Sequence, residues 1–219
     1  MLPVSDVIPS RTTPWVTIAL IAISTGAFLY QALLSPGHAS ALHYTYALVP
    51  DAPVWPAATS GLFLHVGWIH VLTNMICLWI FGENVEDLVG HAAFLAFYLI
   101  TGTLGVMAAA AMDPTFTTPL TGAGPSVAAV MGAYFVLYPG SQVLVLVHLV
   151  VHHDVVEVPA AFLLGLWAVS ELFTHLAPVN APLGDTVTAL VPHVTGFAIG
   201  AVAGGVFRIR VRPGSTRFD

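Results

Sequence analysis

Charged side chains are scarce in this sequence of 219 residues, and lysine is absent. Asp, Glu and Arg together supply 7% of the residues, whereas a soluble domain carries roughly a quarter. So few charges cannot cover the surface of a water-soluble protein of this length. Because hydrophobic residues make up 57% of the chain, the composition predicts an integral membrane protein.

Basic charge is also confined to the two ends of the chain. The five basic residues are Arg11, Arg208, Arg210, Arg212 and Arg217. This distribution forms no basic patch, so no nucleic-acid partner is expected. The single cysteine, Cys77, lies in an apolar run and has no partner for an intramolecular disulfide, which favours a buried thiol.

Six apolar stretches have the length and composition of membrane-spanning helices, which need about 20 residues. They cover roughly residues 14–34, 66–82, 91–112, 124–138, 158–176 and 189–207. The arginines at both ends predict cytoplasmic termini, which require an even number of spans. We therefore predict an all-α membrane protein, a single domain over residues 1–219 with short cytoplasmic tails at about 1–12 and 209–219.

Two segments between these stretches do not resemble spanning helices. Residues 35–65 mix aromatic residues with prolines and are expected to lie at the outer interface. Residues 140–157 are apolar but interrupted by His148, His152 and His153, and we interpret them as a long loop or interfacial segment. On a helix, His148 and His152 would have metal-ligand spacing. With no third ligand fixed, a solvated patch is the preferred interpretation, and no metal or cofactor is expected.

Polar side chains inside apolar helices are costly in a membrane, so they mark candidate functional sites. In the second stretch His70 and Asn74 are four residues apart and share one helical face. Both can donate hydrogen bonds to a common point, as in an oxyanion hole. The alternative is that they bond to neighbouring helices, as polar residues in membrane bundles do.

A second cluster opens the sixth stretch. Gly196, Gly200 and Gly204 recur at every fourth position and predict a flat face that another helix backbone approaches closely. His193 stands on the same side. It is either a packed histidine bonded to a backbone carbonyl or a general base.

A third cluster, around Gly124 and Pro125, opens the fourth stretch. Proline suits the first turn of a helix, and the free backbone amides of that turn point at whatever lies beside Gly124. Alone, this pattern is typical of a helix start selected for tight packing. With a cytoplasmic N-terminus, however, the second, fourth and sixth stretches all begin at the outer face. One polar site below the outer surface is therefore predicted.

Over roughly residues 10 to 208, the sequence resembles the rhomboid family of intramembrane serine proteases. The family pattern is a His-x4-His-x3-Asn motif, a Phe-Gly-Glu-Asn-Val-Glu-Asp run, a Gly-x-Ser-Gly before Gly-Ala-Tyr, and a final His-x2-Gly-Phe. Here the matches are His65, His70, Asn74, Phe81, Gly82, Glu83, Glu86, Gly132, Ala133, Tyr134, His193, Gly196 and Phe197. The resemblance implies a six-helix bundle, with His193 as general base and an oxyanion hole around His65, His70 and Asn74.

The sequence departs from the family at the nucleophile. Counting back from Gly132, the family's serine falls on Gly124 and the glycine after it falls on Pro125. Glycine has no side chain with which to attack a peptide bond. Ser126 lies two residues farther on, which turns it about 200° around the helix and away from His193. Robust proteolysis is therefore not expected.

A small transporter or metal-handling protein built on the histidines of residues 140–157 is a further alternative, but it explains none of the three clusters at helix starts. Three other functions remain open. The first is a pseudoprotease that binds transmembrane helices of clients or partner subunits without cutting them. The second is a genuine rhomboid protease present as an inactive Ser-to-Gly form, and the third is a structural subunit of a larger membrane assembly. Besides membrane lipids, the expected partners are such helices, and the expected location is the bacterial plasma membrane.

Overall fold

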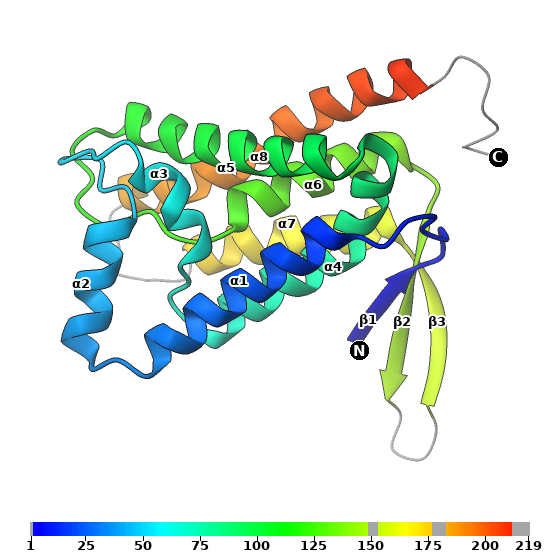
Figure 1. The fold of residues 1–219 in the computed structure, drawn as a ribbon, viewed down its shortest axis with the longest axis horizontal. Coiled ribbons are helices and arrows are strands. Elements are labelled where there is room, and N and C mark those ends of the chain that lie inside the picture. Colours follow the sequence, from blue (N-terminus) through cyan, green and yellow to red (C-terminus); the bar gives the residue numbers. More distant parts are fainter. Residues whose placement is uncertain (1, 149–152, 177–182, 212–219) are drawn as a thin grey trace.

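The computed structural model describes residues 2–148, 153–176 and 183–211. Within these ranges the chain forms helices and one small sheet (Figure 1). The helices are α1 (Trp15–Ala32), α2 (Pro36–Tyr46), α3 (Ala57–Ser60), the 3-10 turn η1 (Gly61–Phe63), α4 (Trp68–Val89), α5 (His91–Met112), α6 (Gly124–Leu137), α7 (Ala160–Leu176) and α8 (Leu183–Val211). The strands are β1 (Leu2–Asp6), β2 (Gln142–His148) and β3 (His153–Pro159).

All six stretches predicted as spans are helical: α1, α4, α5, α6, α7 and α8. Of the described helices, α1, α5 and residues 187–209 of α8 are long and apolar enough to cross a membrane by themselves. Residues 57–63 and α4 pass the same test as a pair bent by 92°, which makes four. Because α6 and the apolar part of α7 are shorter, the count of six spans stays a prediction.

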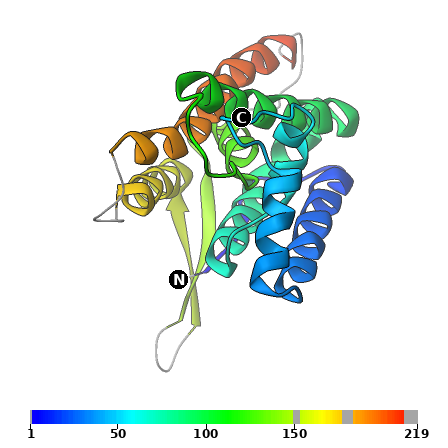
Figure 2. The ribbon, with the colours of Figure 1, turned by 90° about the vertical axis from the view of Figure 1, so that its left-hand side faces the viewer.

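The loop considered for residues 140–157 is instead built largely of two strands, and the interfacial location of this segment stays a prediction. β2 and β3 form an antiparallel hairpin, and β1 pairs antiparallel with the other edge of β2. The segment is rich in valine, which favours extended backbone, but an apolar run alone does not distinguish a strand from a helix. The predicted helical bundle is present, but the all-α prediction missed this sheet. The sheet extends beyond the helices, at the end of the molecule remote from α2 (Figures 1 and 2).

Residues 2–6, which lie within the predicted N-terminal cytoplasmic tail of about residues 1–12, form β1. Asp6, at the end of this strand, is buried, with 7% of its surface exposed. Its carboxylate accepts hydrogen bonds from the Tyr134 hydroxyl, from Asn84 Nδ2 at 3.1 Å and from the Ile8 amide at 3.1 Å. Burial raises the pKa of this carboxyl above its ordinary value. The contacts attach the sheet to α4 and α6.

α6 is the centre of the bundle, and every one of its residues from Gly124 to Tyr134 is buried. It packs most extensively on α8, where glycines replace side chains at the contact. A Cβ at Gly200 would overlap the Ala129 carbonyl and lie 2.6 Å from the Ala129 Cα, and one at Gly204 would lie 2.7 Å from the Ala133 carbonyl oxygen. The flat glycine face predicted from the sequence is thus the surface on which α6 rests.

Two further glycines, one on each helix, extend this close approach of α6 and α8. A Cβ at Gly196 would lie 2.9 Å from the Pro125 carbonyl carbon, and one at Gly132, on α6, would lie 3.0 Å from the Ala201 amide nitrogen. These contacts involve backbone atoms, which cannot swing aside as side chains do. α6 is therefore held against α8 over several turns. This contact sets the position of Gly124, in the first turn of α6, relative to α8.

Glu86 secures the start of α1. This fully buried carboxylate accepts hydrogen bonds from the backbone amides of Val16 and Thr17 at 2.9 and 2.8 Å, and from the Thr17 hydroxyl at 2.7 Å. Those amides have no partner within the helix, so a carboxylate from α4 caps α1. His91 Nδ1 lies 2.6 Å from the same carboxylate. Gly82, one turn earlier on α4, permits the approach, since a Cβ there would lie 3.1 Å from Thr17 Oγ1.

Glu83, another acidic residue of the rhomboid-like run, is only partly buried on α4. It lies three positions before Glu86 and takes no part in the described hydrogen bonds to the start of α1. Within this run, the structure therefore assigns the capping contact to Glu86.

Candidate functional site

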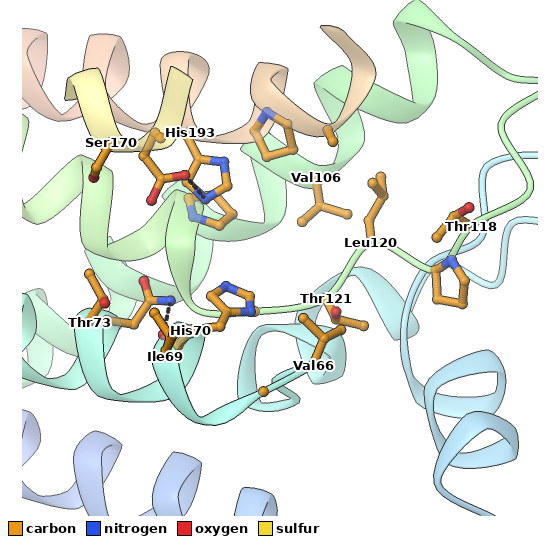
Figure 3. Close-up of a pocket in the computed structure, with 18 of the residues that line it drawn as sticks. Val66, Ile69, His70, Thr73, Val106, Thr118, Leu120, Thr121, Ser170 and His193 are labelled. Atoms are coloured by element: carbon orange, nitrogen blue, oxygen red, sulfur yellow. Dashed lines mark hydrogen bonds and ion pairs between the residues drawn. The ribbon is translucent and has the colours of Figure 1, made fainter. Parts of the chain in front are cut away.

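A cavity of about 850 Å³ lies where the starts of α4 and α6 meet α7 and α8 (Figure 3). Its lining combines apolar residues with hydroxyl, amide, imidazole and carboxylate groups. The polar residues among them are His70, Thr73, Asn74, Thr118, Thr121, Ser170, Glu171 and His193. His70 and His193 stand on opposite walls, on α4 and α8 (Figure 3). Residues from three clusters that are distant in sequence thus contribute to one cavity.

Gly124 lies directly against His193. A Cβ at position 124 would overlap His193 Nε2 and lie 2.7 Å from Cδ2 and 3.1 Å from Cε1. Real Cβ atoms do not approach other atoms so closely, so the imidazole occupies space that any side chain at 124 would require. The pairing of these two positions predicted from the sequence is present, with the histidine filling the gap.

The start of α6 also closes on His70. Gly122 has φ +114°, a conformation that favours glycine, and a Cβ there would lie 2.5 Å from His70 Cε1. The Gly122 amide donates to the Gly61 carbonyl at 3.0 Å, which anchors the loop before α6. Glycine at 122 is therefore required twice, for its backbone conformation and for the space that the imidazole fills.

Asn74 and His70 line the cavity together, as their spacing predicted. The side-chain amide of Asn74 donates from Nδ2 to the backbone carbonyl of His70 at 2.9 Å, one turn earlier on α4. This bond fixes the side chain within its own helix. His65, the third residue expected in the oxyanion hole, is not among the lining residues and is 1% exposed. It accepts a hydrogen bond from the Ala123 amide at 3.4 Å and stacks edge-on against His70, with ring centroids 5.0 Å apart.

Ser126 faces away from the cavity. Its hydroxyl donates to the Tyr98 carbonyl of α5 at 2.8 Å, and the residue is fully buried. This agrees with the orientation expected from its position two residues after Gly124. The Ser126 hydroxyl therefore points to α5 and not into the cavity.

Glu171 is the lining residue that the sequence reasoning missed. It lies on α7, and its Oε2 is 3.6 Å from His193 Nε2. Trp167, one turn earlier on α7, has its ring centroid 6.5 Å from that of His193. An acidic residue inside an apolar helix was a signal available in the sequence. What the sequence did not supply is the direction in which that residue faces.

The histidines of the hairpin do not form the helical pair considered above. His148 and His153 are opposite each other across β2 and β3, so the helical spacing does not apply, and His152 lies outside the described residues. In the part of the chain that the structure describes, no group of three His, Cys, Asp or Glu residues has the geometry to hold a metal ion.

Comparison with known proteins gives two matches. A family model described as "Rhomboid domain" matches residues 52–210 of the chain. The chain is also similar to a protein of Bacillus subtilis (strain 168) named Rhomboid protease GluP, with 32% identity over 79 residues. That alignment covers 36% of this chain and 15% of the Bacillus protein.

Proposed function

Because the chain belongs to the rhomboid family, we propose that it is a rhomboid pseudoprotease that binds transmembrane helices of client or partner proteins without cutting them. The observation that carries the proposal is Gly124. The chemistry of the family depends on a serine at this position. This chain has glycine there, and the His193 imidazole fills the space that a side chain would occupy.

The expected reaction of an active relative explains what is lost. A serine oxygen attacks the peptide carbonyl, the histidine takes the serine proton, and hydrogen-bond donors stabilise the negative charge on the carbonyl oxygen. By the resemblance, His193 has the position of the base, and His70 and Asn74 have those of such donors, but Gly124 carries no side-chain oxygen that could attack. Deleting a triad member in serine proteases leaves only a small residual rate, from the oxyanion hole and binding.

Binding does not require the nucleophile. α7 exposes a row of large apolar side chains, among them Phe162 at 63%, Leu166 at 56% and Phe173 at 65% exposure. In a bilayer such a row contacts lipid or another helix equally well. We place the chain in the bacterial plasma membrane with cytoplasmic termini, on the basis of the arginines at both ends.

A cross-linking experiment tests the binding proposal. A photoreactive residue is introduced at Ala189, which lines the cavity, and the protein is reconstituted with a single-span rhomboid substrate. We expect a cross-linked adduct containing the full-length substrate. The matched control places the same photoreactive residue at the exposed Val202 of α8. Equal adduct from both positions, or none from Ala189, would contradict specific binding.

A further inference from the structure

Among the described residues that line the cavity, Glu171 is the only carboxylic acid, and the other titratable groups are His70 and His193. It stands on α7, four residues after Trp167, so the two side chains share one face of the helix. Both meet His193, Trp167 through its ring and Glu171 through Oε2 at 3.6 Å from Nε2. α7 therefore presents a carboxylate and an aromatic wall to the same imidazole.

The nitrogen that faces Glu171 is the one that a serine at position 124 would need. His193 Nε2 is the atom that a Cβ at Gly124 would overlap, so this nitrogen is adjacent to both positions. A general base must present an unprotonated nitrogen within hydrogen-bond reach of the proton that it removes. A carboxylate beside Nε2 favours a proton on that nitrogen, whereas a general base needs the nitrogen unprotonated.

We infer that Glu171 and His193 form an acid and imidazole pair that has replaced the serine and histidine pair. In this arrangement Glu171 is a positioning residue: it holds Nε2 protonated and turned into the space left by the missing side chain. The sequence alone suggested a site one side chain short of activity. The pair implies that two changes, at 124 and at 171, are needed to restore an activated nucleophile.

This inference rests on the proposed function, because it takes Gly124 to be the former nucleophile position. The proposed function and the inference about Glu171 can be contradicted independently of each other. Cleavage by the unaltered chain would contradict the pseudoprotease and leave the contact between Glu171 and His193 unaffected. Equal reactivity of a restored serine with and without Glu171 would contradict the inference alone.

The test uses a fluorophosphonate probe, which needs no knowledge of the client. The serine oxygen attacks phosphorus, fluoride leaves, and the imidazole takes the serine proton. Labelling rates are compared for Gly124→Ser and for Gly124→Ser combined with Glu171→Gln, an exchange that keeps the shape of the side chain. We expect the double variant to label at least tenfold faster, and the labelling to disappear when His193→Ala is added. Equal rates would overturn the inference.

A second readout reports on His193 directly and decides the case in which neither serine variant is labelled. Diethyl pyrocarbonate modifies unprotonated imidazole nitrogens, and the modified peptides are quantified by mass spectrometry. In the Glu171→Gln chain we expect His193 to react at least threefold faster than in the unaltered chain, while the exposed His38 of α2 keeps its rate. An unchanged His193 rate would overturn the inference. Glu157→Gln, which removes an exposed carboxylate on β3, serves as the matched control for loss of a charge.

Discussion

The contact between α6 and α8 makes Gly200→Ala the most informative single change for the fold. The new Cβ would lie 2.6 Å from the Ala129 Cα, whereas ordinary contact begins at 3.4 Å. Because the Ala129 carbonyl oxygen lies closer still, the two backbones would have to separate by more than about 0.8 Å along an interface that also contains Gly196 and Gly204. Because the obstructing atoms belong to a helix backbone, no rotamer change relieves the overlap.

Overpacking of a well-packed core costs about 1–3 kcal/mol, and the rigid neighbour at this position favours the upper part of that range. Gly205 provides a matched control, because it lies in the same helix and a Cβ there has nothing within 4 Å. Gly205→Ala removes the flexibility of glycine from a helix interior and should stabilise by roughly 0.5–1 kcal/mol. Because the gain from removing a helix glycine applies to both variants and cancels, we expect them to differ by the overpacking cost, about 2–3 kcal/mol in free energy of unfolding.

Equilibrium unfolding of the purified protein in mixed micelles, followed by circular dichroism, measures this difference. A Gly200→Ala variant as stable as Gly205→Ala would refute the close packing of α6 on α8. The position of Gly124 against His193 would then lose its structural basis.

Three further changes test other parts of the structure. Glu86→Gln weakens the cap on α1 and should lower the free energy of unfolding by about 2 kcal/mol, measured in the same micelles. Asp6 has a raised pKa, so its charged form destabilises the fold: stability is greatest below the ordinary value of 3.8 and falls as the pH rises through the range above it. Asp6→Asn should remove that dependence, and parallel pH profiles of the two proteins would contradict it. Gly122→Ala should displace His70 and lower cross-linking of client helices in the cavity, and an unchanged adduct yield would refute the close fit.

The helices could be predicted from the sequence because their signal is local. A run of apolar residues with the length of a bilayer predicts α5 at 91–112, and the structure has the same bounds. The convergence of His70, Gly124 and His193 on one region was also predictable, since alternating helices begin on the same side. Neither inference requires knowledge of side-chain direction.

The sheet and Glu171 could not be predicted in the same way. The valine-rich segment of β2 and β3 is apolar throughout, and its partner β1 lies more than a hundred residues away in the chain. The Asp6 side chain is bound by Asn84 and Tyr134, which belong to two different helices. Glu171 was visible as an acid in an apolar helix, but its contact with His193 depends on how α7 rotates against α8.

The central claim is that this rhomboid-family chain does not cut, because position 124 lacks a nucleophile. The most direct measurement reconstitutes the unaltered protein in liposomes with a single-span rhomboid substrate and quantifies cleaved product against protein-free liposomes. We predict no product above that background. Product that appears with the unaltered chain, survives Ser126→Ala and disappears with His193→Ala would contradict the claim.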